Sequence, residues 1–391
     1  MRERRDMATR RSNAQLDVTE DADPFVGFQV DPDRHKGRRV KGRGTRSNRA
    51  GRFESYQREA VDDGWNVDFD EEELPPLRTS VQEEKSRTII TRNDSPDISF
   101  DRSINPYRGC EHGCVYCFAR PTHAYMGLSA GLDFETKLFA KPEAATQLRK
   151  ELSAPGYRPK AIAIGTNTDP YQPIERRYQL MPAILDVLIE TGHPVGIVTK
   201  SNLILRDLDR LKALNERNLV KVALSVTSLD NTLSRRLEPR AASPQKRLEA
   251  IEKLSEAGIP TCVMVAPIIP ALNDEEVEAI LAAAYDAGAR EAGTILLRLP
   301  NEVNALFQEW LLKHYPDRYR HVMNVLRSMR GGKDYDSRSG HRMRGNGPYA
   351  DILHKRMAVA CRNLGYATRR TRLALKHFKP PECEVAQLSL F

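Results

Sequence analysis

The chain has 391 residues, 40% of them hydrophobic, and carries a formal net charge of +8. This length allows one large domain with extensions, and six cysteines with three in one short loop do not form the disulfide framework of a secreted protein. No apolar run approaches the ~18 residues of a membrane helix, and the Arg-rich start is interrupted by Glu3 and Asp6, so we expect a cytoplasmic protein without a membrane partner.

Residues 1–85 are polar and charged, and we predict a largely disordered basic extension with one short helix at 53–63. Its stretch 35–52 contains eight Lys and Arg residues and no acid, and a second basic stretch covers 327–344. Such stretches can be solvated tails that aid solubility. Two of them, together with the net charge, favour a nucleic acid as partner.

From residue 86 onward, short apolar runs alternate with helical periodicity. We predict strands at 97–101, 160–166, 194–200, 220–227, 261–269 and 294–300, and helices at 181–192, 205–217, 243–258 and 273–288. Ser243 and Asn273 are expected to cap the last two helices. The alternation implies parallel strands, and six strands over 86–300 predict an α/β fold with a partial, TIM-like (β/α)6 barrel.

The remainder of the chain is predicted to be helical over 301–378, with helices at 302–314, 319–329 and 349–364. Residues 379–391 begin with Lys-Pro-Pro-Glu and are predicted to form a flexible tail that ends in Gln387-Leu388-Ser389-Leu390-Phe391.

Three cysteines follow the first predicted strand. Cys110, Cys114 and Cys117 have the spacing C-x3-C-x2-C, with Tyr116 directly before the last. Three thiolates can bind three irons of a [4Fe–4S] cube and leave the fourth iron open to a cofactor. This loop should face the carboxyl ends of the barrel strands, where α/β barrels place their chemistry.

The alternative is a zinc site, because clustered cysteines in intracellular proteins are commonly zinc ligands. His112 or His123 would then complete the tetrahedron. Zinc sites usually combine two cysteine pairs, whereas Cys262, Cys361 and Cys383 are isolated in the sequence. We therefore favour the iron–sulfur cluster.

The cysteine spacing resembles the signature of the radical S-adenosylmethionine (SAM) superfamily. VTKSNLILRDLDRL and LEPRAASPQKRLEAIEKLSEAGIP resemble spore photoproduct lyase and its DNA-repair-photolyase-like relatives, over roughly residues 100–300. GTNTDPYQPIE and HRMRGNGPYAD are more similar to an uncharacterised bacterial subgroup. The resemblance implies a [4Fe–4S] cluster on the three cysteines, SAM on its open iron, and an external reductant such as flavodoxin or ferredoxin that drives cleavage to a 5′-deoxyadenosyl radical.

The resemblance also implies roles for residues at the strand ends. Lys200 would pair with the SAM carboxylate, and the backbone near Tyr116 would meet the adenine. Thr168, Asp169 and Ser225 would contact the amino group and the ribose. Lys200 could instead be a solvated lysine at a strand end, and Asp169 could cap a turn before a proline.

One departure concerns the residue before Thr168. Relatives that resemble the lyase carry a hydrogen-donating cysteine there, whereas this chain has Asn167, and no cysteine lies between 117 and 262. We therefore expect the radical chemistry to be kept and the substrate chemistry to differ from thymine-dimer repair.

The last five residues resemble the bacterial sliding-clamp-binding motif, with Gln387 at a pocket rim and Leu388, Leu390 and Phe391 in an apolar groove. Folding back onto the domain is the alternative. The function we predict is a radical SAM enzyme that acts on DNA in repair. The alternatives are a radical SAM enzyme that modifies RNA or a peptide, and a non-catalytic iron–sulfur protein that binds nucleic acid or senses redox state.

Overall fold

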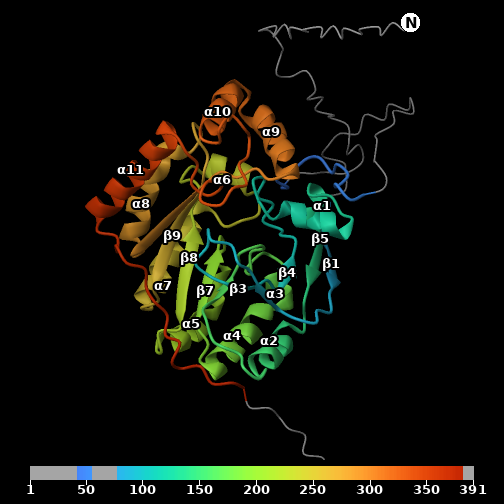
Figure 1. Cartoon of the computed structure of the whole chain (residues 1–391), viewed down its shortest axis with the longest axis vertical. Coiled ribbons are helices and arrows are strands. Elements are labelled where there is room, and N and C mark those ends of the chain that lie inside the picture. Colours follow the sequence, from blue (N-terminus) through green and yellow to red (C-terminus); the bar gives the residue numbers. More distant parts are fainter. Residues whose placement is uncertain (1–41, 55–76, 382–391) are drawn as a thin grey trace, which may run out of the picture. The chain divides into compact units, whose positions relative to one another are not determined.

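The computed structural model describes residues 42–54 and 77–381, all of which belong to one compact unit, Arg34–Phe391 (Figure 1). The helix predicted at 53–63, apart from its first two residues, lies outside the described residues. The motif at Gln387–Phe391 also lies outside them.

The main sheet has seven strands, of which β2 is antiparallel to its neighbour and the other six run parallel. In sheet order the strands are β10 (Glu291–Leu296), β9 (Thr261–Ile268), β8 (Val220–Ser225), β7 (Val195–Thr199), β6 (Ile162–Ile164), β3 (Arg102–Ile104) and β2 (Ile90–Arg92). Six parallel strands in consecutive order confirm the predicted α/β fold and its parallel sheet.

Two strand positions differ from the prediction. The strand expected at 97–101 forms instead at Arg102–Ile104. Asp97 cannot join it, because its carboxylate accepts bonds from the backbone N–H of Gly340 and from Arg342, which hold this segment as a loop. The last strand, β10, begins three residues earlier than predicted and ends at Leu296.

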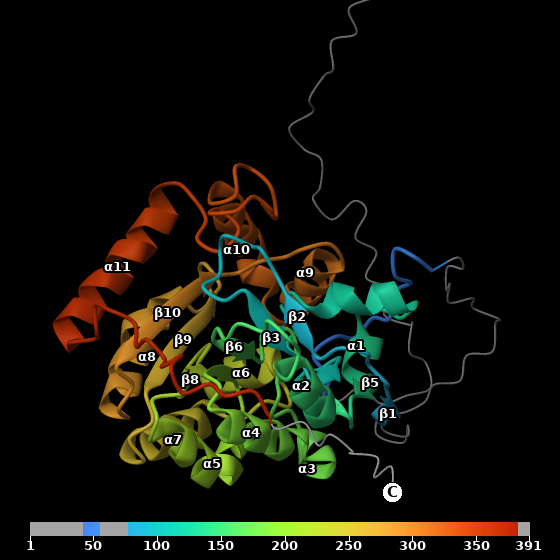
Figure 2. The same ribbon diagram turned by 60° about the horizontal axis from the view of Figure 1, so that its bottom comes forward.

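Helices follow the strands and cover the outer face of the sheet (Figures 1 and 2). They are α2 (Ala144–Leu152), α3 (Glu175–Tyr178), α4 (Leu180–Thr191), α5 (Leu208–Asn215), α7 (Pro244–Glu256) and α8 (Val277–Asp286). At the carboxyl ends of the strands, α6 (Asn231–Leu237) lies beside the cysteine loop, because the carbonyl of Leu237 accepts from the N–H of Val115. The 3₁₀ turns are η1 (Arg120–Met126), η2 (Asn202–Asp207) and η3 (Asp274–Glu276). Ser243 caps α7 as predicted, accepting a bond from the N–H of Lys246.

The predicted cap at Asn273 is wrong. Its side chain does not cap the helix. Its oxygen accepts from the N–H of Ile269, and its amide donates to the carbonyls of Thr227 and Pro267. The side chain therefore ties the ends of β8 and β9 together, and the helix starts only after η3.

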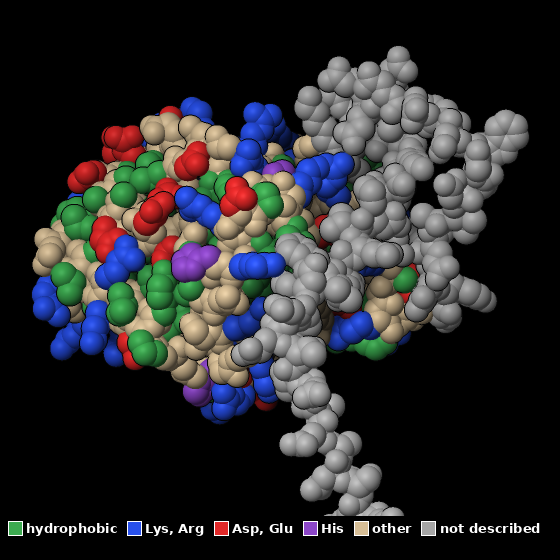
Figure 3. Space-filling model, turned by 90° about the horizontal axis from the view of Figure 1, so that it is seen from above, with side chains coloured by type: hydrophobic (Ala, Val, Ile, Leu, Met, Phe, Trp, Pro, Cys, Tyr) green, Lys and Arg blue, Asp and Glu red, His purple; other side chains and the backbone are tan. Residues whose placement is uncertain are grey.

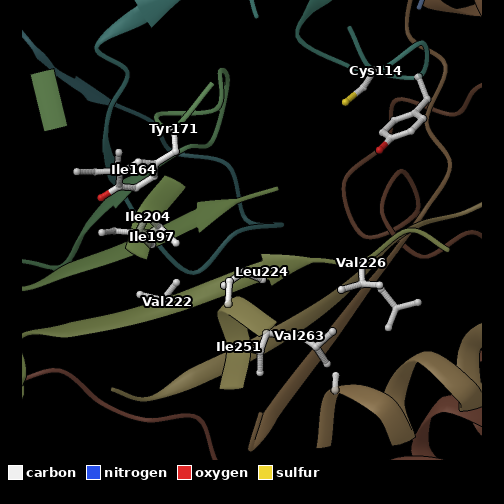
Figure 4. Close-up of a cluster of buried hydrophobic side chains, with 14 of the residues drawn as sticks. Cys114, Ile164, Tyr171, Ile197, Ile204, Val222, Leu224, Val226, Ile251 and Val263 are labelled. Carbon is white, nitrogen blue, oxygen red and sulfur yellow. The ribbon is translucent and has the colours of Figure 1, made fainter. Parts of the chain in front are cut away.

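The core lies between the sheet and these helices. Ile164, Ile197, Val222 and Leu224 are fully or almost fully buried, as expected for parallel strands covered by helices (Figure 4). In Figure 4, β8 runs from Val222 through Leu224 to Val226, and Cys114 lies on the side to which that strand runs.

A second, smaller sheet lies beside the cysteine loop. It consists of β1 (Ser80–Glu83), β5 (Lys137–Ala140) and β4 (Tyr107–Arg108), and α1 (Leu132–Thr136) leads into β5. The segment 42–54 packs here, because the N–H groups of Gly44 and Thr45 donate to the buried carboxylate of Glu135. Segments 42–54 and 77–85, which composition assigns to the extension, are thus part of the packed structure.

The region beyond residue 300 contains the three predicted helices, α9 (Glu302–His314), α10 (Pro316–Ser328) and α11 (Pro348–Leu364). In Figure 1, α11 lies along α8, and α9 and α10 lie above the ends of the strands. None of the helices in the described ranges is long and apolar enough to span a membrane.

Candidate active site

The cysteine loop follows β4 at the carboxyl ends of the main-sheet strands. Cys110 and Cys114 are buried, Cys117 is half-buried, and all three are free thiols. Burial raises the pKa of Cys110 well above its usual range and that of Cys114 to about 12. The two buried thiols resist ionisation unless a cation takes the place of their protons, so these two, together with the half-buried Cys117, form a donor set that fits a metal cluster.

The donors also fit a cube better than a single ion. Within the described ranges, no three His, Cys, Asp or Glu side chains are arranged to hold one metal ion. A [4Fe–4S] cube takes each thiolate at a different iron, so the sulfurs need not converge. Of the histidines considered as zinc ligands, His112 faces Asp169 at 3.4 Å and His123 contacts the carbonyl of Lys137 at 2.9 Å.

A buried arginine holds the backbone of the cysteine loop. The Arg120 guanidinium is fully buried and donates to the carbonyls of Cys114 (2.9 Å) and Gly113 (3.1 Å). It also donates to the carbonyls of Ala130 and Gly131 and, at 2.6 Å, to Glu135. Five bonds from one planar group fix the loop from inside.

Gln172 anchors the start of the same loop. Its side-chain oxygen accepts from the N–H of Glu111 (2.8 Å), and its amide donates to the carbonyl of Gly109 (3.1 Å). Gly109 has φ +74°, and a Cβ there would lie 2.5 Å from Leu138, so this sharp turn requires glycine. The segment after β6, which carries Gln172, therefore helps to fix the position of the cysteine loop.

Lys200 directly follows Thr199, the last residue of β7, and its side chain lies near the cysteine loop. Its Nζ lies 5.9 Å from the ring centroid of Tyr116 and forms no ion pair within the described part of the chain. Burial acts to lower the pKa of Lys200, but the charges of Cys114 and Glu238 outweigh it and the pKa is raised. A retained point charge with no partner suits one anionic group of a ligand.

The bonding capacity of Asp169, by contrast, is largely used within the protein. Its oxygens accept from the N–H of Tyr171 (2.9 Å), the hydroxyl of Thr199 (2.7 Å) and the N–H of Lys200 (2.7 Å). Burial opposes ionisation, yet His112 and these bonds lower the pKa of Asp169 to about 2. Asp169 thus links the end of β7 to the cysteine loop. It also caps its own turn, which was the alternative considered.

Thr168 and Ser225 are also placed within the protein framework. The Thr168 hydroxyl is buried and donates to the carbonyl of Tyr107 at 3.0 Å. Ser225 ends β8, and its carbonyl accepts a bond from Arg247 at 2.9 Å. All five strand-end and loop residues predicted to contact the cofactor therefore lie at this edge of the sheet, but Lys200 alone among them presents an unpaired charge.

A buried network that the sequence does not reveal fixes Tyr116. Its hydroxyl donates to Glu238, which also accepts from Thr227 (2.6 Å) and pairs with Arg247. Glu238 lies far along the chain, just after α6, and is fully buried. The ring of Tyr116 is thereby held between the cysteines and Lys200. A basic residue four positions into α7 was the only sequence signal for Arg247.

Comparison with known proteins gives three findings. The family model of the Radical SAM superfamily matches residues 104–284. An uncharacterized protein of Mycobacterium tuberculosis (strain ATCC 25618 / H37Rv) is 40% identical over 230 residues, which are 58% of this chain and 68% of that protein. One of Methanocaldococcus jannaschii is 29% identical over 224 residues, 56% of this chain and 79% of that protein.

Among solved structures, spore photoproduct lyase complexed with dinucleoside spore photoproduct is similar with a TM-score of 0.54. The match covers 73% of this chain and 80% of the lyase at 17% sequence identity. At that identity the similarity shows a shared fold, and it agrees with the parallel sheet described above.

Proposed function

The chain belongs to the radical SAM superfamily and is therefore an enzyme that uses a [4Fe–4S] cluster and S-adenosylmethionine, and we propose that it acts on nucleic acid, with DNA favoured over RNA. The cluster, when bound, supplies the electron that cleaves SAM reductively and yields the 5′-deoxyadenosyl radical. Cys110, Cys114 and Cys117 would hold it.

The observation that carries the cofactor assignment is the unpaired cation of Lys200 beside two buried thiols and a half-buried one. A half-buried ammonium without an ion-pair partner is costly, and a ligand carboxylate would compensate for that cost. Lys200 would bind the SAM carboxylate in this way. Ser225 and the backbone at Tyr116 would contact the same ligand.

Other residues of the site would position these groups. Asp169 and Thr168 bind the ends of β7 and β4, so they would orient Lys200 and the cysteine loop and need not touch SAM with their side chains. The network of Glu238, Arg247 and Tyr116 is buried and would keep water from the radical.

Support for a nucleic-acid substrate comes from the net charge of +8 and the basic stretch 35–52. The second basic stretch supports it less. Arg327, Arg338 and Arg342 pair with Asp334, Asp336 and Asp97. Seen from above, acidic and basic side chains are interspersed on the surface (Figure 3).

We further propose that the C-terminal motif Gln387–Phe391 docks on the bacterial sliding clamp and delivers the enzyme to DNA under repair. A short segment with apolar side chains at Leu388, Leu390 and Phe391 is suited to dock in an apolar groove. Deleting the five residues should abolish binding to purified clamp. Equal binding, or its absence in both forms, would remove this support for DNA. A cytoplasmic flavodoxin or ferredoxin would supply the electron.

The central test is SAM cleavage by the reconstituted, reduced protein. Wild type should release 5′-deoxyadenosine, and Cys114→Ala should not. Cys361→Ala is the matched control, because Cys361 lies on α11 and is expected to leave cleavage unchanged. Cleavage by Cys114→Ala at the wild-type rate would contradict the proposal. No cleavage by wild type would favour a non-catalytic iron–sulfur protein.

A further inference from the structure

Two groups of exposed aromatic side chains lie on or beside the segment that follows the cysteines. Phe118, directly after Cys117, is 44% exposed, although its neighbours Tyr116 and Ala119 are buried. Tyr125 in η1 is 72% exposed and stacks on Phe53, which is 57% exposed, with 5.2 Å between ring centroids. No other aromatic side chain is among the exposed large hydrophobic residues of the described ranges.

An arginine lies over each group. The Arg298 guanidinium is 4.2 Å from the ring centroid of Phe118. The Arg52 guanidinium is 5.3 Å from that of Phe53 and 5.9 Å from that of Tyr125. Single exposed hydrophobic residues are ordinary on protein surfaces, but all three exposed rings occurring beside a guanidinium is a pattern that needs a reason.

Arg298 is unusual because it lacks an acidic partner. It follows β10, is half-buried, and donates one bond, to the sulfur of Met343 at 3.2 Å. Within the described ranges it forms no ion pair with a carboxylate. Arg342, which lies nearby, is already paired with Asp97. A guanidinium that is partly removed from water and left without an anion is a site for an anionic ligand.

We propose that Phe118 with Arg298, and the Phe53–Tyr125 pair with Arg52, bind a single-stranded polynucleotide, whose bases stack on the rings and whose phosphate binds the Arg298 guanidinium. Arg52 is paired with Glu302 at 2.6 Å, so it holds the outer pair of rings in place and adds positive charge beside it. This inference rests on the proposed function and names its substrate class. We call these five residues the aromatic–arginine surface.

The chemistry of the surface favours unpaired strands. Aromatic platforms next to arginines bind single strands because every base offers a π-face, whereas bases in a duplex are already stacked on one another. An enzyme that acts on a base must also have that base outside the helix. A peptide carboxylate could pair with Arg298, but it would leave the rings without a function.

The placement of the surface fits a substrate that enters from outside. Phe118 adjoins a predicted cluster ligand, and Tyr125 lies seven residues further on in η1, where the five steps from Arg120 rise roughly 10 Å. A strand bound along this line would present one nucleotide to the cysteine site while its neighbours are held by the outer pair.

The test is binding of labelled oligothymidylate, oligouridylate and a DNA duplex of equal length, measured by fluorescence anisotropy over a range of salt concentrations. Phe118→Ala should weaken single-strand binding roughly 5- to 100-fold, and Phe118→Tyr, which keeps a stacking ring, should restore it. Arg298→Gln should lower the slope of log affinity against log salt by about 0.7. The two single-stranded probes distinguish DNA from RNA.

Arg210→Gln is the matched control, because Arg210 pairs with Asp186 on the outer helices and the substitution removes the same charge. The inference would be overturned if Phe118→Ala and Arg298→Gln bound the single strands with an affinity within about twofold of that of Arg210→Gln. It would also be overturned if wild type bound the duplex more tightly than the single strands. Wild type that cleaves SAM but binds no single strand would overturn the inference alone, whereas absence of SAM cleavage would count against the cofactor chemistry.

Discussion

Replacing Arg120 with lysine tests whether its guanidinium holds the cysteine loop. The guanidinium is fully buried and makes four bonds to carbonyls of 2.9–3.1 Å and one to Glu135. A lysine ammonium has three donors, so at least two carbonyls lose their partner. Hydrogen bonds to charged groups contribute about 1.5–3 kcal/mol each, so Arg120→Lys should lower the free energy of unfolding by about 3–6 kcal/mol.

The loss should also appear in the metal content, because two of the carbonyls belong to Gly113 and Cys114. We would measure urea unfolding and iron bound per chain after reconstitution. Arg356→Lys is the control, because Arg356 pairs with Glu278 at the α8–α11 contact and is more exposed. It should change stability by about 1 kcal/mol or less and keep full iron. Arg120→Lys with stability within about 0.5 kcal/mol of wild type and unchanged iron would refute the reasoning.

Three further outcomes are expected. A Cβ on Gly44 would lie 1.6 Å from the carbonyl oxygen of Gly113, so Gly44→Ala should destabilise by about 1–3 kcal/mol in urea unfolding, whereas Gly196→Ala, with its nearest atom at 3.9 Å, should be neutral. Burial lowers the pKa of His193 from 6.5 to about 4. The unfolded chain then takes up a proton first as the pH falls, so about 3 kcal/mol of stability present above pH 6.5 should be lost by pH 4, and an unchanged pH profile in His193→Gln would argue against this. Lys200→Met should weaken SAM binding at least ~10-fold in equilibrium dialysis, with iron retained; equal affinity would remove Lys200 from the cofactor site.

Much of the fold could be predicted because its signals are local. The strands β6 to β9 and the helices α4 and α7 follow periodicity that any short window contains, and Ser243 caps its helix by bonding a residue three positions away. The parallel arrangement of the strands then follows from the alternation of strands and helices along the chain. The cysteines came from their spacing and from the rule that chemistry gathers at the carboxyl ends of strands, whereas Lys200 came from the resemblance to spore photoproduct lyase and its relatives.

The parts that could not be predicted depend on partners distant in the chain. Glu238 contacts Tyr116 across 122 positions, and no local pattern distinguishes it from a surface glutamate. Composition also misjudged segment 42–54, because its polar backbone bonds to the buried Glu135 about 90 positions later. The basic stretch 327–344 resembles a binding surface in composition, because net charge does not show that Arg327 and Arg338 pair with acids of the same stretch and Arg342 with the distant Asp97.

A polar side chain near a strand end can bind a ligand only if its hydrogen-bonding or charge-pairing capacity is not already used within the protein. The sequence pattern does not show this, but the structure does. Asp169 and Lys200 both lie in loops that follow strands beside the cysteines. Asp169 accepts three hydrogen bonds from the protein, whereas the Lys200 amino group forms no ion pair with any described carboxylate. Arg298, which no motif marks, shares this property with Lys200. Because an unpaired buried or half-buried cation costs stability, each implies an anion that binds there. From their positions, Lys200 near the Tyr116 ring and Arg298 over the exposed Phe118 ring, we propose that the first binds the cofactor and the second the substrate.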